Sequence, residues 1–277
     1  MKLAMRSLFL LLLLAAAPLA AATGHEQDDD LAYVISASGQ FGALELETGK
    51  FLQFNPNAPL SLNGLARGPH NTIYGLDAAN NLVTLNPATG AVAVVGNTGL
   101  PLGPNDNIAL FTSLGNGALY ALDFQNFLWS VNRSTGKAKP IGSTGIAVPA
   151  DFTTCHCVTA NGLAGAEDEL FFSWEVADDP DNPPISPPSP SDVPSTLYRI
   201  NPHTAAAHKV GLTNTAAPIV GLGFVDDTLY GFTFGPAVGE PNKILKISRG
   251  TGKAEVVTSQ DPSLDPVFAA IPARLEH

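Results

Sequence analysis

The chain has 277 residues, of which 45% are hydrophobic and 14% charged, and it carries a formal net charge of −11. This composition supplies a large core and excludes an intrinsically disordered chain, and the 26 glycines and 23 prolines favour many turns over long helices. The negative charge argues against nucleic acid and anionic membrane surfaces as partners.

The first 22 residues have the features of a secretory signal peptide. Lys2 and Arg6 form a positive region, residues 8–17 are apolar, and residues 20–22 are the small residues that precede a cleavage site. The rival interpretation is a membrane anchor, but the apolar run is short for a span, and no other stretch could cross a bilayer. We expect cleavage after Ala22, an acidic linker at 23–31, and a periplasmic or secreted protein.

The stretch 72–99, TIYGLDAANNLVTLNPATGAVAVVGNTG, reads as three short strands and two turns, and relatives of it recur along the chain. Successive copies of its first Gly-terminated turn are 41, 46, 69 and 47 residues apart. Periods of about 40–50 residues with short strands are typical of β-propeller blades. The five copies of this turn end at Gly49, Gly90, Gly136, Ala205 and Gly252.

Each unit repeats the same order of four strands. An inner strand rich in Gly and Ala comes first, followed by a strand with an aromatic residue, a third with apolar and polar residues alternating, and an outer strand. Small residues suit a strand beside a central channel, where backbones approach closely. Alternation and β-branched residues favour strands over helices. The predicted inner strands are 62–65, 108–111, 161–164 and 220–223.

The first unit lacks an inner strand, whereas residues 265–272 form an apolar run without a partner. We predict that this C-terminal run completes the first blade, which closes the ring and removes exposed sheet edges. The expected fold class is therefore all-β, a single β-propeller domain at 32–277 with five four-stranded blades. Six blades are the alternative, if the long unit between Gly145 and Gly211 contains a degenerate blade.

The pattern LYALD…L…NxxTG…GxTG, which covers Ala32 to about Pro272, resembles secreted bacterial β-propellers of domain-of-unknown-function families. It is also similar to the wider group of lactonase-like and quinoprotein-like propellers. The resemblance implies the fold but brings no catalytic residue. The tryptophan-docking pattern of pyrroloquinoline-quinone enzymes, Trp-Asp pairs, Asp-boxes and calcium-binding nonapeptides are absent from the sequence.

The positions of the longer connections predict which face binds a ligand. Tight turns join the first strand to the second and the third to the fourth, whereas longer connections lie between blades and between the second and third strands. Since successive strands reverse direction, the longer connections share one face, which we predict to be the binding face. The largest, the Pro-rich insertion at 177–195, is expected to be solvated and semi-rigid.

Cys155, His156 and Cys157 lie just before a predicted inner strand, at the channel mouth on that face. In an exported chain the cysteines could form one disulfide, although Cα atoms two residues apart in a strand are separated by about 6.6–7 Å, so the segment must bend. Two thiolates and an imidazole could instead bind zinc or copper with further ligands. Free or intermolecular thiols are the third alternative.

Carboxylates predicted on the same face form a second group of candidates. Those in and beside the insertion could give oxygen ligands to calcium, but the alternating calcium-loop pattern is missing, and a solvated loop is the stronger interpretation. Three others could serve glycoside hydrolysis if about 5–9 Å apart, although such residues are more often loop caps or exposed charges. The first set is Glu175, Asp178, Asp179, Asp181 and Asp192, and the second is Asp106, Asp151 and Glu240.

These features favour an exported, non-enzymatic propeller that binds a protein, a glycan or a metal on its loop face. The alternatives are a hydrolase of the lactonase or glycosidase type with carboxylates at the channel mouth, and a metal-binding protein that uses Cys155, His156 and Cys157. No catalytic residue is assigned and no cofactor is predicted, with zinc, copper and calcium as the ions considered. We expect a monomer without a membrane span after signal removal.

Overall fold

The computed structural model describes residues 30–55, 59–101, 109–147, 161–174, 195–215, 217–234 and 241–273. Within these ranges the chain is nearly all β, with twenty strands and one short 3-10 helix, η1 (Pro69–Asn71). That single helical turn is far too short to cross a membrane, and these ranges contain no longer helix.

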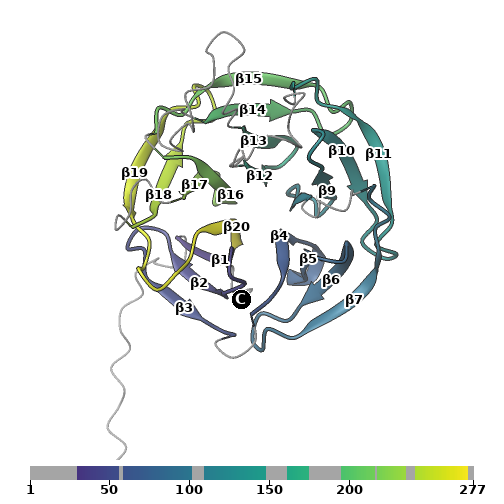
Figure 1. Ribbon diagram of the computed structural model, residues 1–277, viewed down its shortest axis with the longest axis horizontal. Coiled ribbons are helices and arrows are strands. Elements are labelled where there is room, and N and C mark those ends of the chain that lie inside the picture. The colour runs from purple at the N-terminus through teal and green to yellow at the C-terminus, as the bar shows by residue number, and fades with distance from the viewer. Residues whose placement is uncertain are drawn as a thin grey trace, which may run out of the picture.

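The strands form three four-stranded sheets and one eight-stranded sheet, arranged around a common axis in the manner of a propeller (Figure 1). In each four-stranded sheet the strands run from the axis outward in chain order. These sheets are β4 (Leu62–Arg67), β5 (Ile73–Asp77), β6 (Asn81–Leu85) and β7 (Val92–Asn97); β8 (Leu110–Ser113), β9 (Leu119–Leu122), β10 (Phe127–Val131) and β11 (Ala138–Ser143); and β12 (Asn161–Gly165), β13 (Leu170–Trp174), β14 (Thr196–Ile200) and β15 (Ala207–Leu212).

The eight-stranded sheet joins the two ends of the chain. Its C-terminal strand pairs antiparallel with β1, from Ala32↔Pro272 to Ile35↔Ala269, which confirms the predicted pairing of the C-terminal run with the first unit (Figure 1). On its other side the same strand pairs in parallel with β16 at only two positions. The strand order is β19 (Ala254–Ser259), β18 (Lys243–Ile247), β17 (Thr228–Thr233), β16 (Ile219–Val225), β20 (Val267–Pro272), β1 (Leu31–Ser36), β2 (Phe41–Glu45) and β3 (Phe51–Gln53).

Glycines in the inner strands let neighbouring sheets approach closely at the axis, as the sequence predicts. A Cβ atom on Gly165 of β12 would lie 2.0 Å from the carbonyl oxygen of Ser113 in β8. One on Gly221 of β16 would lie 2.2 Å from the carbonyl oxygen of Val267 in β20. Since real Cβ contacts are essentially never shorter than 3.0 Å, only glycine fits at these positions.

The hydrophobic core lies in clusters between adjacent sheets, and bulges in the outer strands contribute to it. In four outer strands the register skips one residue, which leaves an extra apolar side chain. Each of these side chains is partly buried and packs against a cluster that includes residues of the next sheet or, in the eight-stranded sheet, residues of β1 and β2 at its other end. The four residues are Val95, Ile141, Val210 and Val257.

The repeated glycine-terminated turns also join neighbouring sheets. Gly136 has a φ of +75°, and a Cβ atom there would lie 2.3 Å from the carbonyl oxygen of Gly96 in the preceding outer strand. Ala205 occupies the equivalent turn position with a φ of 64°. It faces Gly142, where a Cβ atom would lie 3.5 Å from that of Ala205, so this contact is looser and accommodates a methyl group.

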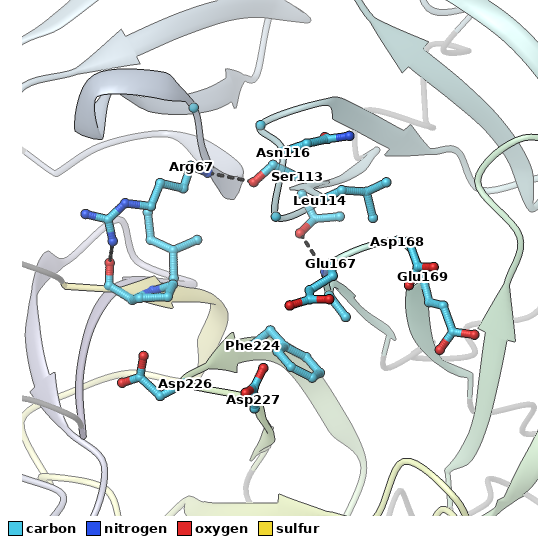
Figure 2. A pocket seen from close by; sticks show the side chains of 18 of the residues that line it. Arg67, Ser113, Leu114, Asn116, Glu167, Asp168, Glu169, Phe224, Asp226 and Asp227 are labelled. Atoms are coloured by element: carbon cyan, nitrogen blue, oxygen red, sulfur yellow. Dashed lines mark hydrogen bonds between the residues drawn. The ribbon is translucent and has the colours of Figure 1, made fainter.

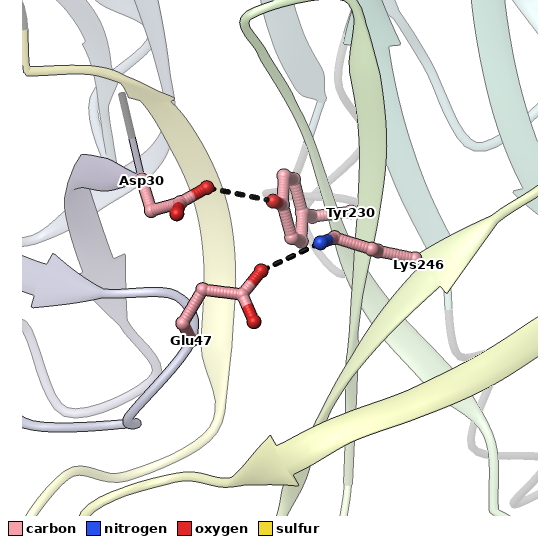
Figure 3. Close-up of polar contacts among 4 residues, drawn as sticks. All are labelled: Asp30, Glu47, Tyr230 and Lys246. Atoms are coloured by element: carbon pink, nitrogen blue, oxygen red, sulfur yellow. Dashed lines mark hydrogen bonds and ion pairs between the residues drawn. The ribbon is translucent and has the colours of Figure 1, made fainter. Parts of the chain in front are cut away.

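Polar contacts support the junction between the first and last units of the ring (Figure 3). Lys246 Nζ donates to Glu47 Oε1 at 2.5 Å, and the Tyr230 hydroxyl donates to Asp30 Oδ1 at 3.4 Å. The Lys246 ammonium also lies 5.7 Å from the centroid of the Tyr230 ring. Burial, more than any neighbouring charge, raises the pKa of Tyr230 to about 12.

One buried side chain departs from the repeat. After β7 and β15 a threonine donates both its backbone N–H and its hydroxyl to a carbonyl, as Thr98 does to Asn80. Gln260 follows β19 and keeps the backbone bond, with its N–H 2.7 Å from the carbonyl oxygen of Asn242. The residue is only 2% exposed, yet its side-chain amide has no hydrogen-bond partner among the described residues, which carries a desolvation cost.

Candidate functional site

A cavity of about 1210 Å³ opens at the axis, on the face where the inner strands turn into the second strands. Turns from four units and the end of β20 meet there. We call this cavity the axial funnel. Its lining consists of residues 67–71, 112–117, 165–169 and 270–272, together with Phe224, Asp226, Asp227 and Arg249.

The local sequence explains why polar groups reach the rim of the funnel. The two-residue turn Asp226–Asp227 has positive φ at both positions, 41° and 62°, a conformation that aspartate and asparagine tolerate better than most residues. In η1, Pro69 fixes the first position, and His70 and Asn71 also have positive φ. Both turns are therefore built from residues with short or polar side chains that end up beside the cavity.

Arg67 connects three units of the ring at the wall of the funnel. Its Nε and Nη2 donate to Asn71 Oδ1 at 3.2 and 2.6 Å, and its Nη1 donates to the carbonyl oxygen of Pro272 in β20. Its backbone N–H donates to Ser113 Oγ in β8 at 2.9 Å (Figure 2). These bonds make Arg67 part of the scaffold that shapes the cavity.

The hydroxyl groups of the wall have scaffold partners as well. Ser113 Oγ accepts from Arg67, and Thr112 Oγ1 accepts from the backbone N–H of Gly165 at 3.1 Å. In the part of the chain that the structure describes, neither hydroxyl is hydrogen-bonded to a histidine or a carboxylate that could act as a base. The arrangement lacks the nucleophile–base contact that defines covalent catalysis by serine or threonine.

Acidic side chains dominate the charge of the funnel, with five carboxylates against two guanidinium groups. Glu167, Asp168 and Glu169 come from the β12–β13 turn, and Glu169 pairs with Arg199 at 3.1 Å. Asp226 and Asp227 come from the turn of the adjacent sheet, because β12 packs beside β16, and Figure 2 draws the carboxylates of both turns around the cavity. Because these two neighbouring turns supply five carboxylates to the lining, the cavity as a whole favours cationic groups.

An aromatic stack forms part of the funnel floor. Phe224 of β16 stacks on the buried Phe171 of β13, with ring centroids 6.1 Å apart and an interplanar angle of 21°. The guanidinium carbon of Arg249, from the β18–β19 turn, lies 5.3 Å from the centroid of Phe224. The buried Phe171 therefore supports Phe224, and Phe224 in turn holds the guanidinium of Arg249 beside the cavity.

The sites predicted from the sequence all lie outside the described residues. They are Asp106, Asp151, Cys155, His156, Cys157, Glu175, Asp178, Asp179, Asp181, Asp192 and Glu240. The disulfide, the zinc or copper site, the calcium site and the carboxylate pair therefore stay predictions. Elsewhere, the described ranges hold no group of three or more His, Cys, Asp or Glu residues placed to bind a metal.

The sequence pattern did not predict the funnel. It placed the binding face on the side of the longer connections, whereas the funnel opens on the side of the tight turns between the first and second strands. A usable signal was nevertheless present. Charged or amide residues recur in the turn between the first and second strands, in His70–Asn71, Asn116, residues 167–169 and Asp226–Asp227. Side chains at equivalent positions of successive blades must meet at one end of the axis, so an alignment of these turns predicts the cluster.

Comparisons with known proteins give distant likenesses only. No protein-family model matches the chain, and no curated protein matches it. Virginiamycin B lyase from Staphylococcus aureus, in selenomethionine-substituted form, is similar in structure with a TM-score of 0.44 and 14% identity over 86% of this chain and 72% of that chain. A catalytically inactive form of that lyase with quinupristin has a TM-score of 0.44 and 16% identity, over 83% of this chain and 70% of that chain.

A third solved structure is the extracellular domain of a candidate one component system from B. thetaiotaomicron. Its TM-score is 0.41 and its identity 13%, over 87% of this chain and 29% of that chain. Likenesses at this level assign neither an activity nor a site residue to this chain, so we infer its function from the residues of the funnel.

Proposed function

We propose that the protein is an exported binding protein whose ligand docks in the axial funnel. The observation that carries the proposal is the cavity of about 1210 Å³, which is lined by charged side chains from several units of the ring. Ligand sites commonly have volumes of about 300–1,000 Å³ with a few convergent polar groups, so this cavity is large enough for a ligand. Its wall hydroxyls serve the scaffold, which favours binding over nucleophilic catalysis.

We also propose that the ring consists of five four-stranded blades. The eight-stranded sheet divides naturally at the contact between β16 and β20, which is parallel and pairs two residues of each strand. The pairings on either side of it are antiparallel and longer, as expected within a blade. The signal-like residues 1–22 support export to the periplasm or beyond.

We further propose that the ligand carries cationic groups. Carboxylates outnumber guanidinium groups in the lining, and the whole chain is also acidic. Each exposed ion pair contributes only about 0.2–1 kcal/mol, so affinity requires several contacts together and weakens as salt is added. On a flat surface, the turns of different blades could not contact one ligand at the same time.

Binding of cationic probes tests the function. Agmatine and arginine are titrated by calorimetry at ionic strengths of about 0.01 M and 0.15 M. The double variant Glu167→Gln, Asp227→Asn is expected to bind both probes at least about fivefold more weakly. Glu255→Gln, Asp265→Asn changes the net charge equally at exposed positions outside the lining and is expected to bind normally.

Two results would overturn this function. An equal loss of probe affinity in the funnel variant and in its control would mean that binding depends only on the net charge of the protein. Turnover in a screen of lactone, ester and glycoside substrates, abolished by Glu167→Gln, Asp227→Asn, would replace a binding protein with a hydrolase.

A further inference from the structure

Arg249 carries a positive charge in a cavity whose charged side chains are mostly acidic. It is exposed and lies in the same lining as five carboxylates, yet it forms no ion pair with a carboxylate anywhere in the described ranges. Its contact is with the face of Phe224, at 5.3 Å from the ring centroid. A guanidinium stacked in this way keeps its N–H donors at the edge of the plane.

The other arginines near the cavity use their donors on the protein. Arg67 donates to Asn71 and Pro272, and Arg199 pairs with Glu169. Arg249 makes no hydrogen bond to any residue in the described part of the chain. It is therefore the guanidinium of the funnel that has donors available for a ligand.

The stack also fixes where those donors lie. Phe224 is held by Phe171, which is 1% exposed and belongs to the neighbouring sheet. A guanidinium resting on such an anchored ring loses part of its freedom before any ligand arrives. Its planar fork matches a carboxylate, which can accept two parallel N–H···O bonds.

We propose that Arg249, stacked on Phe224, binds a carboxylate of the ligand, so that the funnel selects zwitterionic molecules such as amino acids or short basic peptides. This inference rests on the proposed function and specifies its ligand. The cationic groups of the ligand face the carboxylates of Glu167, Asp226 and Asp227, and its carboxylate faces Arg249. A purely anionic ligand is repelled by the five carboxylates, and a purely cationic one leaves Arg249 unpaired and meets its repulsion.

Arginine and agmatine form a matched pair of probes, because agmatine is arginine without its carboxylate. Calorimetry at low ionic strength is expected to show that wild type binds arginine about tenfold more tightly than agmatine, as a charge-assisted bidentate pair allows. Arg249→Gln is expected to abolish this preference, while agmatine binds as well or better. Arg249→Lys keeps the charge but not the planar fork, so it restores only part of the preference.

Lys253→Gln is the matched control, since it removes one exposed positive charge nearby in the chain but outside the lining. It is expected to leave the preference for arginine unchanged. Thermal melting of each variant checks that the fold is intact, and lysine with cadaverine repeats the comparison with a second pair of probes.

The outcomes separate this inference from the function on which it rests. If both probes bind through the funnel carboxylates with equal affinity in wild type, the carboxylate role of Arg249 is refuted and the binding function stands. The same conclusion follows if Arg249→Gln and Lys253→Gln have equal effects. If none of the four probes binds, both the inference and the cationic-ligand function are refuted.

Discussion

Gly136→Ala tests how the ring holds neighbouring sheets together. The turn that contains Gly136 packs on the bulge of the preceding outer strand at Gly96. An added Cβ atom would lie 2.3 Å from the carbonyl oxygen and 2.7 Å from the carbonyl carbon of Gly96. Both are backbone atoms, so no side chain can rotate away and one of the two sheets must shift.

The expected cost has two parts. An alanine in the left-handed region, where Gly136 has a φ of +75°, costs about 1–2 kcal/mol. Overpacking a close contact costs a further 1–3 kcal/mol, roughly. The sum of about 2–5 kcal/mol is a large part of the total stability of a domain, typically about 5–15 kcal/mol. For a chain of this size, about 3 kcal/mol lowers the melting temperature by roughly 6–12 °C.

Two other glycines separate the parts of this cost. Gly99 has a φ of +72° but no described residue within 4 Å of an added Cβ atom, so Gly99→Ala reports the backbone strain alone. Gly250 has no positive φ, and no residue in the described ranges lies within 4 Å of an added Cβ atom, so Gly250→Ala is expected to be neutral or slightly stabilising. Thermal and urea unfolding of the three variants, followed by circular dichroism, gives the comparison.

The expected order of stability is Gly250→Ala first, then Gly99→Ala, then Gly136→Ala. A Gly136→Ala protein as stable as the Gly99→Ala protein would refute the reasoning. The turns would then be local connections, and the sheets would be held together by their apolar clusters without this backbone contact.

Three further predictions concern Arg67, Gln260 and Tyr230. Arg67→Lys loses the forked contact to Asn71 and Pro272 and is expected to cost about 1–2 kcal/mol in urea unfolding, whereas Arg133→Lys in an exposed turn should cost nothing measurable. Gln260→Thr restores the hydroxyl of the repeat and removes two unpaired buried atoms, so the melting temperature should rise by about 2–4 °C, and Thr98→Val should lower it. Tyr230 has a folded-state pKa of about 12, above the ordinary value of 10.0, so the unfolded chain releases its proton first and stability should fall between these pH values. Tyr230→Phe should flatten that fall in urea titrations at rising pH, and an unchanged slope would contradict the assignment.

The strands could be predicted from the sequence because each repeat specifies its own pattern. Small residues marked the inner strands, and the predicted strand 161–164 is observed as Asn161–Gly165. The predicted strand 108–111 overlaps the observed strand Leu110–Ser113, which ends two residues later, and residue 108 lies outside the described residues. Thr112 and Ser113 belong to the observed strand because they pair with Tyr120 and Leu119 of β9, and their hydroxyls also bond to neighbouring sheets, a contact that no local pattern reveals.

The funnel was harder to predict because its residues read as ordinary solvated turns. Asp226–Asp227 is a typical hairpin turn, and Glu167–Asp168 resembles an exposed loop. Only the ring brings these turns to one end of the axis, beside Arg67 and Pro272, which are 205 positions apart in the chain. The stacking of Arg249 on Phe224, without an ion pair in the described part of the chain, has no signature in the sequence.

The pairing of β20 with β1 has a consequence for how the protein folds. The two strands lie at opposite ends of the chain, so the ring closes only after nearly all of the sequence is available, and such long-range pairing is slow. Until then the edge of β1 is exposed, and β20 from a second copy could occupy it as well as the chain's own strand. Refolding at high concentration should therefore produce dimers that exchange their last strand, and deletion of residues 267–273 should remove this route while leaving β1 open to aggregation.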